Sequence, residues 1–398
     1  MNLPPTTSLP LEGEAKAGSP RILIRGTNWL GDAVMTTPAL LRLREKFPEA
    51  HIALLTPEKL RDLWLASPKQ GKGGPHHPVV NEIIPFVPGE NAFSVGQKLR
   101  AGKFDLALIF PNSPRSVIET WLAGIPKRMG YARPWRNFFL TNAIAPRADT
   151  VKTRKRSTSE IKRLIRGTGF QPVNHPNTGQ RPVPHSSAHQ IHEYLHLAAA
   201  LGANSEPLPP QLVVTPDEIE AAKKKFGLNE IEQPIFGLNA GAEYGPAKRW
   251  PIKKFIAATR EIQQYTNCVW LLFGGKADVL IANQIKSTQN SKLKIQNLIG
   301  QTSLRELMAL LKACRVLLTN DSGPMHVAAA LGTPVVVPFG STSPELTGPG
   351  LPGDTRHRLL KSDAPCSPCF RRECPIDFRC MNGISVERVV KAVLETIK

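Results

Sequence analysis

The chain of 398 residues is long enough for two to three domains, at roughly 150 residues each. Apolar residues make up 41% and charged residues 21%, as in packed globular proteins, and no stretch approaches the roughly 18 apolar residues that a membrane-spanning helix needs. The net charge of +19 favours a polyanionic partner, which could be nucleic acid, an anionic membrane face or a phosphorylated substrate.

Residues 1–20 (MNLPPTTSLPLEGEAKAGSP) lack the apolar run of a secretory signal. We interpret them as a flexible leader and expect the protein to stay in the cytoplasm. The first folded domain is expected to begin at residue 21 and to extend to residue 205.

The first half of the chain alternates short apolar runs with segments of helical periodicity. Strands that alternate with helices predict a parallel sheet covered on both faces, as in a Rossmann-like domain. The predicted strands are 21–25 (RILIR), 51–55, 82–86 and 106–110, and the predicted helices are 34–47 and 116–123.

Residues 150–188 break this pattern, because they are strongly basic, rich in Pro, Thr, Asn and Ser, and poor in large apolar residues. We interpret them as a disordered or loosely packed insertion. The alternative is a nucleic-acid-binding tail, although Phe170 alone provides an aromatic ring among the basic residues.

A second doubly wound domain is predicted over 206–384, followed by an amphipathic helix over 385–398. Two such domains leave a cleft bounded by the carboxyl ends of both sheets, where ligands of α/β proteins usually bind. A predicted helix over 190–201, still in the first domain, leads into the second. The predicted strands of the second domain are 235–238, 269–273, 316–319 and 335–339, and its predicted helices are 251–264, 278–286, 303–312 and 325–331.

The turn after the first strand, residues 26–32 (GTNWLGD), carries a candidate base. It lacks the G-x-G-x-x-G spacing of dinucleotide-binding proteins, and the second half lacks it too, which argues against a nicotinamide oxidoreductase. It also lacks the Gly-Lys-Ser/Thr end of a P-loop. Asp32 is either the N-terminal cap of the following helix or a general base for an acceptor hydroxyl, since its strand end faces the predicted cleft.

Two loops of the second half have the composition of anion-binding loops. Residues 239–249 contain two glycines and Lys248, which is either a surface lysine beside a helix start or a point charge for a diphosphate. Residues 320–326 (NDSGPMH) connect a strand to a helix whose first amides, together with Ser322, suit an anion. Asp321 can accept hydrogen bonds from sugar hydroxyls, and His326 is either a buried hydrogen-bonded histidine or part of this site.

The cysteines divide into two groups. Cys268 and Cys314 lie in apolar stretches and are expected in the core. Four others lie within fifteen residues of one another, which suggests either a structural metal clip or free, redox-active thiols. These four are Cys366, Cys369, Cys374 and Cys380.

Several long motifs together resemble one enzyme family. The chain resembles the ADP-heptose:lipopolysaccharide heptosyltransferases of glycosyltransferase family 9, and within them the heptosyltransferase II branch. The similarity covers about residues 21–147 and 190–395, and the basic 150–188 segment and the leader depart from it. The motifs are ILIRGTNWLGDAVMTTPALLRLREKFP, LIFPNSPRS, ETWLAGIPKRMGY, NAGAEYGPAKRWP, TNDSGPMHVAAALGTPVVVPFGSTSPELTGP and CSPCFRRECP.

This resemblance implies a GT-B fold with an acceptor-binding N-terminal domain and a donor-binding C-terminal domain. It implies an inverting enzyme that needs no metal, with Asp32 as the base and Lys248 on the donor phosphates. The segment that lines the donor site in the family matches Asp321, Ser322, Gly323 and His326. Gly241 and Ala242 fall where the family approaches the diphosphate with its backbone.

The resemblance also implies the substrates and the location. The donor would be ADP-heptose, and the acceptor would be the inner-core glycolipid of lipopolysaccharide, reached by transient contact with the inner face of the cytoplasmic membrane. We expect no nucleic acid as partner. A GT-B enzyme with a different nucleotide sugar, or a basic nucleic-acid-binding protein, are the alternatives.

Overall fold

The computed structural model describes residues 19–65, 79–151, 153–166, 188–287 and 293–398. Counting only these residues, the chain divides into two compact units. The main boundary between the units falls after Leu208, and residues 29–34, 151, 153–166 and 188–190 group with the second unit. Of the described residues, the first unit contains 19–28, 35–65, 79–150 and 191–208, and the second contains 29–34, 151, 153–166, 188–190, 209–287 and 293–398.

The first unit is built on a parallel sheet that has six strands within its described residues, in the order β3-β2-β1-β4-β5-β6. Its central strand β1 pairs on both sides, with Leu23 opposite Ala53 of β2 and Ala107 of β4. All four residues of β4 are buried, as expected where helices cover both faces of a sheet. The strands are β1 (Arg21–Arg25), β2 (His51–Pro57), β3 (Glu82–Phe86), β4 (Leu106–Ile109), β5 (Lys127–Tyr131) and β6 (Asn142–Ile144).

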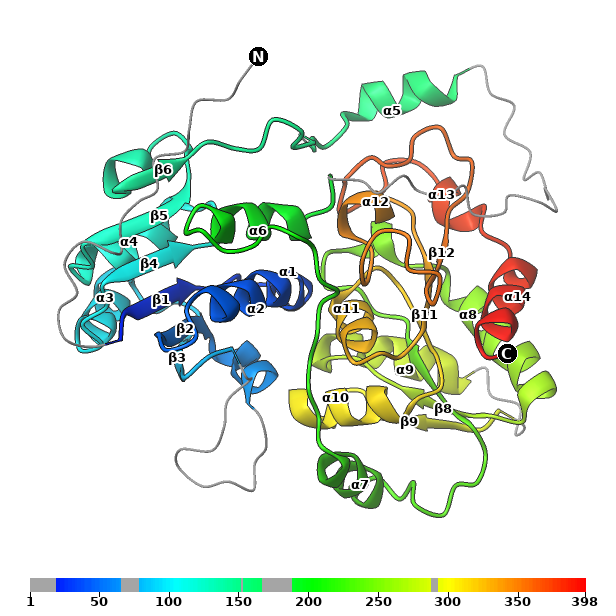
Figure 1. Cartoon of the computed structure of the whole chain (residues 1–398). Helices are drawn as coiled ribbons and strands as arrows, with labels where there is room; N and C mark the ends of the chain where they lie inside the picture. The colour runs from blue at the N-terminus through cyan, green and yellow to red at the C-terminus, as the bar shows by residue number, and fades with distance from the viewer. Residues whose placement is uncertain (1–18, 66–78, 152, 167–187, 288–292) are drawn as a thin grey trace. The chain divides into compact units, whose positions relative to one another are not determined.

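Helices and short 3-10 turns of the first unit connect these strands (Figure 1). Asn91 and Ser113 cap α3 and α4, because each side-chain oxygen accepts a hydrogen bond from a backbone N–H of the first turn. The elements are α2 (Thr37–Lys46), η1 (Glu58–Trp64), α3 (Ala92–Arg100), α4 (Pro114–Leu122), η2 (Asn137–Phe139) and α6 (Ile191–Ala199).

The second unit repeats the same topology. Within its described residues it has six parallel strands in the order β12-β11-β10-β7-β8-β9, which is the order of the first sheet with the strands renumbered. The strands are β7 (Ile235–Asn239), β8 (Val269–Leu272), β9 (Ile295–Asn297), β10 (Leu317–Thr319), β11 (Val335–Pro338) and β12 (Arg358–Leu360). The predicted α/β class with two Rossmann-like parallel sheets is confirmed.

The helices of the second unit include α14, the predicted C-terminal amphipathic helix, which buries Val389, Val390 and Val393. No helix in the described part of the chain is long and apolar enough to cross a membrane. The elements are α1 (Leu30–Met35), whose last residue is grouped with the first unit, α5 (Thr158–Ile165), α7 (Pro216–Lys225), η3 (Pro246–Lys248), α8 (Ile252–Thr266), η4 (Lys276–Asp278), α9 (Val279–Ser287), α10 (Leu304–Ala313), α11 (Gly323–Ala330), α12 (Pro344–Thr347), α13 (Arg379–Asn382) and α14 (Val386–Thr396).

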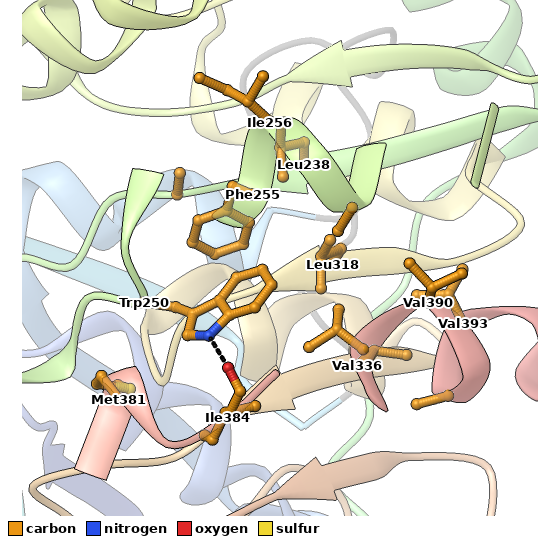
Figure 2. Close-up of a cluster of buried hydrophobic side chains, with 14 of the residues drawn as sticks. Leu238, Trp250, Phe255, Ile256, Leu318, Val336, Met381, Ile384, Val390 and Val393 are labelled. Atoms are coloured by element: carbon orange, nitrogen blue, oxygen red, sulfur yellow. Dashed lines mark hydrogen bonds between the residues drawn. The ribbon is translucent and has the colours of Figure 1, made fainter. Parts of the chain in front are cut away.

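Trp250 lies at the centre of the core of the second unit (Figure 2). Its ring packs edge-on against Phe255, with centroids 4.9 Å apart, and its indole N–H donates a hydrogen bond to the carbonyl of Ile384 at 3.1 Å. A buried indole N–H without such a partner would be costly. Trp250 therefore joins the loop that carries Lys248 to the C-terminal segment.

Two helices replace the single helix predicted over 34–47. α1 begins at Leu30 and ends at Met35, and α2 begins at Thr37. Pro38 lies in the first turn of α2, where its missing N–H costs nothing, whereas inside one continuous helix it would remove a hydrogen bond and clash with the preceding turn. The earlier start places Asp32 inside the first turn of α1.

The segment 150–188 is only partly as predicted. The expected lack of packed structure is wrong for residues 153–166, because they contain α5, which is capped by Ser157 and buries Ile161 in the core of the second unit. The interpretation relied on overall composition and overlooked one capped turn with an apolar face. Residues 152 and 167–187, like 1–18 of the predicted leader, lie outside the described residues.

Candidate active site

Two asparagines organise the carboxyl end of the second sheet. β7 and β10 are neighbours. Asn239 is the last residue of β7, Asn320 directly follows β10, and both side chains are buried. The amide of Asn239 donates to the hydroxyls of Thr319 (3.1 Å) and Ser322 (2.9 Å). Asn320 accepts from the backbone N–H of Trp250 and donates to the carbonyl of Ala240, both at 2.8 Å. The two candidate anion-binding loops are thus bonded to each other.

Lys248 and Asp321, one from each loop, form a buried ion pair. The lysine Nζ lies 2.7 Å from the aspartate Oδ2, and the two side chains are 14% and 4% exposed. The hydroxyl of Thr342 donates to the same carboxylate oxygen. Lys248 Nζ also lies 4.8 Å from the centre of the Tyr244 ring, a cation–π contact. The structure therefore holds the predicted phosphate-binding cation in a fixed position.

The segment 29–34, grouped with the second unit, packs against the start of α11. A Cβ added at Gly31 would lie 2.7 Å from Cδ2 of His326, and one added at Gly323 would lie 2.8 Å from Cδ2 of Leu30. Both distances are too short for a real contact, so this approach requires glycine at both positions. The first and the last of the predicted site motifs are brought together in this way.

Asp32 lies beside the Lys248–Asp321 pair. Burial raises the pKa of its carboxyl group, and the charge of Asp321 raises it further. A hydrogen bond from Nε2 of Gln190, at 3.0 Å, and the charge of Lys248 act in the opposite direction. A carboxylate with a raised pKa is a stronger base than an ordinary surface aspartate, which is what proton abstraction from a hydroxyl needs.

His326 is a neutral buried histidine. The side chain is 5% exposed, and burial lowers its pKa to about 4 against the raising effect of Asp321. The imidazole therefore carries no charge near pH 7. It contributes shape and a polar ring to the site, and not a second cation beside Lys248.

The backbone of Gly241 and Ala242 lies close to polar side chains of the second unit. A Cβ at Gly241 would meet the carboxylate of Asp278 at 2.6 Å, and Asp278 accepts a hydrogen bond from the N–H of Gly275 at 3.0 Å. The carbonyl of Ala242 accepts from Arg249 at 3.2 Å. The loop thus approaches a carboxylate closely, and a backbone contact from Gly241 to a diphosphate stays a prediction.

The four-cysteine loop supports the site from behind. The N–H groups of Cys369 and Phe370 donate to the carbonyl of Ser341, which precedes Thr342. The Tyr244 hydroxyl donates to the carbonyl of Phe370 at 2.8 Å, and the N–H of Ala247 donates to that of Arg372 at 2.9 Å. This loop therefore positions Thr342 and Tyr244, two residues that contact the Lys248–Asp321 pair.

The thiols of this loop are mostly buried and are not joined by disulfides. Cys366, Cys369 and Cys380 are buried, and Cys374 is half-buried with its Sγ 3.3 Å from the N–H of Phe378. Burial and the neighbouring thiols raise the pKa of Cys366, and they raise that of Cys380 to about 12. Within the described ranges no group of three or more His, Cys, Asp or Glu side chains is arranged to hold a metal ion.

The first unit holds a buried arginine charge at the carboxyl end of its own sheet. Arg136 is 0% exposed, and its Nη1 donates to the carbonyl of Pro111 (2.9 Å) and to Oδ1 of Asn112 (3.3 Å). Its Nε and Nη2 have no hydrogen-bond partner among the residues that the structure describes. Burial lowers its pKa to about 10, with a further contribution from Arg133.

Sequence reasoning missed five residues of these two sites: Asn239, Asn320, Gln190, Thr342 and Arg136. Asn239 and Asn320 are the first residues of the two predicted loops, and Thr342 lies within a motif of the family, but the sequence alone assigned these side chains no role. The sequence predicts Gln190 only as the first residue of a helix. Nothing local distinguishes the buried Arg136 from the exposed basic residues around it.

Comparison with known proteins identifies the family of the chain. The model of glycosyltransferase family 9 (heptosyltransferase) matches residues 170–378. The chain is 30% identical over 344 residues to lipopolysaccharide heptosyltransferase 2 of Salmonella typhimurium and to that of Escherichia coli, covering 83% of this chain and 85% of each relative. The solved structure of the E. coli ADP-heptose lps heptosyltransferase II is similar with a TM-score of 0.72 and 26% identity, over 95% of this chain and 98% of that chain.

The similarity extends over most of both chains and is matched by the architecture of two doubly wound parallel sheets. It also includes the segments that carry Lys248, Asp321 and His326. The chain therefore belongs to glycosyltransferase family 9, the heptosyltransferases, and is a glycosyltransferase of GT-B fold.

Proposed function

We propose that the protein transfers a heptose from ADP-heptose to the inner core of lipopolysaccharide, with inversion at the anomeric carbon and without a metal ion. The observation that carries this proposal is the position of Asp32, a carboxylate of raised pKa, beside the buried Lys248–Asp321 pair. The substrate class is supported by the relatives that are named as lipopolysaccharide heptosyltransferases.

Asp32 acts as the general base in this mechanism. Its carboxylate takes the proton from an acceptor hydroxyl, and the oxygen attacks the anomeric carbon from the face opposite the diphosphate. The bond from that carbon to the ADP oxygen breaks at the same time, so the configuration inverts. Gln190, which donates to Asp32 at 3.0 Å, orients the carboxylate.

Lys248 and the start of α11 stabilise the leaving group. Charge grows on the diphosphate as the bond breaks, and fixed positive groups near that charge lower the barrier. Lys248 supplies a full positive charge, and the amides around Ser322 and Gly323 supply the partial charge of a helix start. Asp321 and Thr342 hold the lysine in place until the donor binds.

The remaining donor contacts follow from the strand ends. Asp321 follows β10 and Asp278 lies in η4 after β8, so the two carboxylates follow the strands on either side of β7, at the sheet edge where Rossmann-like folds bind ribose and sugar hydroxyls. His326 lines the same region as a neutral ring, and Gly241 and Ala242 offer backbone contacts. The four-cysteine loop acts as support, either as free thiols or with a structural metal, and takes no part in the chemistry.

The acceptor is proposed to be anionic and to be reached at a membrane. Arg136 holds a positive charge without a carboxylate partner in the described residues, which favours a ligand that brings a negative charge. The net charge of +19 favours the anionic inner face of the cytoplasmic membrane, so we propose a cytoplasmic enzyme in transient contact with that surface.

A binding panel tests the donor class first. ADP-heptose, UDP-glucose, NAD and a DNA duplex are titrated by calorimetry into metal-free protein. Selective binding of ADP-heptose that is lost in Lys248→Ala is the expected result. Binding of another nucleotide sugar in its place would keep the fold and reject the heptosyl donor, and binding of DNA alone would reject the transferase.

A transfer assay tests the reaction itself. Purified protein, ADP-heptose and a truncated core glycolipid are incubated with and without EDTA, and the product is analysed by mass spectrometry and NMR. Addition of one heptose with inverted anomeric configuration, unchanged by EDTA, is expected. Retained configuration would remove Asp32 from its role as the base in a single displacement.

A further inference from the structure

The turn after β5 in the first unit exposes large aromatic side chains. Trp135 is 90% exposed and Phe138 is 87% exposed, the two highest values among the large apolar residues of the described chain. Trp121, at the end of α4, is 46% exposed. Single exposed apolar residues are ordinary, but several together mark a surface that meets another body.

Three of the aromatic rings are in contact with one another, those of Trp121, Phe138 and Phe139. The ring of Phe139 lies 5.3 Å from that of Trp121 and 5.4 Å from that of Phe138, both edge-on. The turn itself is closed by the side chain of Asn137, which accepts from the N–H of Arg133 at 2.8 Å. Trp135 has a φ of +68°, a left-handed conformation that is costly for a bulky residue. The fold therefore presents this side chain outward at a cost.

The segment of the chain that carries this turn is basic. Between Glu119 and Asp149 the chain has no acidic residue. Lys127, Arg128 and Arg133 lie in this stretch, and none of the three has an ion-pair partner within the described part of the chain. We name the aromatic–basic surface by its members: Trp121, Trp135, Phe138, Phe139, Lys127, Arg128 and Arg133.

We propose that the aromatic–basic surface docks the enzyme on an anionic lipid bilayer. Tryptophan and phenylalanine insert at the level of the lipid headgroups, and basic side chains around them bind anionic headgroups. A protein partner would match the aromatic residues equally well, but the stretch of basic residues without any acidic one matches a uniformly anionic surface better. This inference rests on the proposed function, since an acceptor embedded in a membrane requires such a surface.

Vesicle binding tests the surface without any substrate. The full chain is mixed with vesicles of phosphatidylethanolamine and phosphatidylglycerol, or of phosphatidylcholine alone, and the bound fraction is measured by sedimentation. The aromatic variant is Trp135→Ser with Phe138→Ser, and its matched control is Tyr265→Ser with Leu280→Ser, which are 69% and 74% exposed on the second unit. The charge variant is Lys127→Glu with Arg133→Glu, and Lys253→Glu on α8 is its control.

The wild type is expected to bind the anionic vesicles and not the neutral ones. Both variants of the surface should bind at least about tenfold more weakly, while both controls bind as the wild type does. Thermal unfolding should be unchanged in the aromatic variant, because the substituted side chains are exposed. Equal binding by wild type and aromatic variant would overturn the proposal, and so would a change in self-association without a change in vesicle binding.

Donor binding separates this proposal from the proposed function. The aromatic variant should keep the affinity for ADP-heptose and the transfer rate to a soluble acceptor fragment, and lose rate only with acceptor in vesicles. Loss of transfer by every form of the protein, with vesicle binding still dependent on Trp135, would reject the heptosyltransferase and leave the surface standing. Unchanged transfer to acceptor in vesicles would count against the surface alone.

Discussion

The two units share one strand order but treat charge differently at the ends of their strands. In the second unit, Lys248 is paired with Asp321 and the asparagines are bonded to neighbouring loops. In the first unit, Arg25 is paired with Glu119 at 2.8 Å, but Arg136 has no carboxylate partner among the described residues. The same backbone topology thus carries a paired cation, Lys248, in one unit and, within the described residues, an unpaired cation, Arg136, in the other. Function therefore has to be argued from the side chains and not from the fold.

The largest expected effect is at Asp32, the proposed base beside the Lys248–Asp321 pair. Asp32→Asn should lower kcat by roughly 10²- to 10⁴-fold, the usual contribution of a positioned base. Donor affinity should change little, because the amide keeps the size of the carboxyl group. ADP release measured in a coupled assay gives the rate.

Stability gives the control for this variant. A raised pKa in the folded state means that ionised Asp32 opposes folding at neutral pH, and this cost is relieved as the pH falls through the folded pKa. Asp32→Asn should therefore be at least as stable as the wild type at pH 7. Near-normal turnover in a folded Asp32→Asn would exclude it as the base.

The second prediction breaks the neutral pair. Lys248→Met leaves the carboxylate of Asp321 buried without its cation, which should lower the free energy of unfolding by about 3–5 kcal/mol. The double variant Lys248→Met with Asp321→Asn should recover part of that loss, since no charge remains buried alone. Urea unfolding of the three proteins measures this, and equal midpoints for single and double variants would argue against coupling between these residues.

His326 gives a pH-dependent test of the same site. Its pKa is lowered to about 4, so between its ordinary pKa and that value the unfolded chain binds more protons than the folded one. Its contribution to stability is present above about pH 6.5 and is lost as the pH falls toward 4, by up to about 3 kcal/mol.

The matching variant is His326→Gln, whose urea midpoint should fall less steeply over this pH range. His357 is a second buried histidine with a pKa lowered to about 4, so part of the pH dependence should remain in the variant. His357→Gln removes that part and leaves the contribution of His326. A profile in His326→Gln that coincides with that of the wild type would mean that folding does not lower the pKa of this histidine.

The sequence predicted the most apolar strands well, because each is an apolar run bounded by turn residues. β1 and β3 have the predicted bounds, and β7 extends one residue beyond them. The strands β5, β6, β9 and β12 were not predicted. β5 begins with two basic residues, and β6, β9 and β12 are three residues long and leave no clear pattern. α5 was missed because one capped turn is hidden within a basic, polar segment.

Only those residues of the candidate site that stand in local sequence motifs could be predicted. Asp32, Lys248 and Asp321 stand in motifs that contain glycine, and the structure places them together. The bonds of Asn239 to Ser322 and of Asn320 to Trp250 join residues about 70 to 80 positions apart, which depends on strand order and not on local pattern. Burial of Arg136 is of the same kind, because it follows from packing against β4 and β5.

The smallest expected effect on stability is at Arg136. It tests directly whether the cations of the two units differ in role. Arg136→Met removes a buried charge that lacks a carboxylate partner, so the free energy of unfolding should stay the same or rise by about 1 kcal/mol. Its matched control is Arg25→Met, which should be strongly destabilised because it leaves the carboxylate of Glu119 with only the more exposed Arg115.

Kinetics then decide what the charge of Arg136 is for. If it serves an anionic acceptor, Arg136→Met should raise the KM for the acceptor and leave the affinity for the donor unchanged, while Arg136→Lys keeps part of the effect. A residue retained at a cost to stability and needed only for the acceptor is what a binding role predicts. If Arg136→Met instead lost stability as Arg25→Met does, the charge would be structural, and the contrast between the two units would lie only in the aromatic–basic surface.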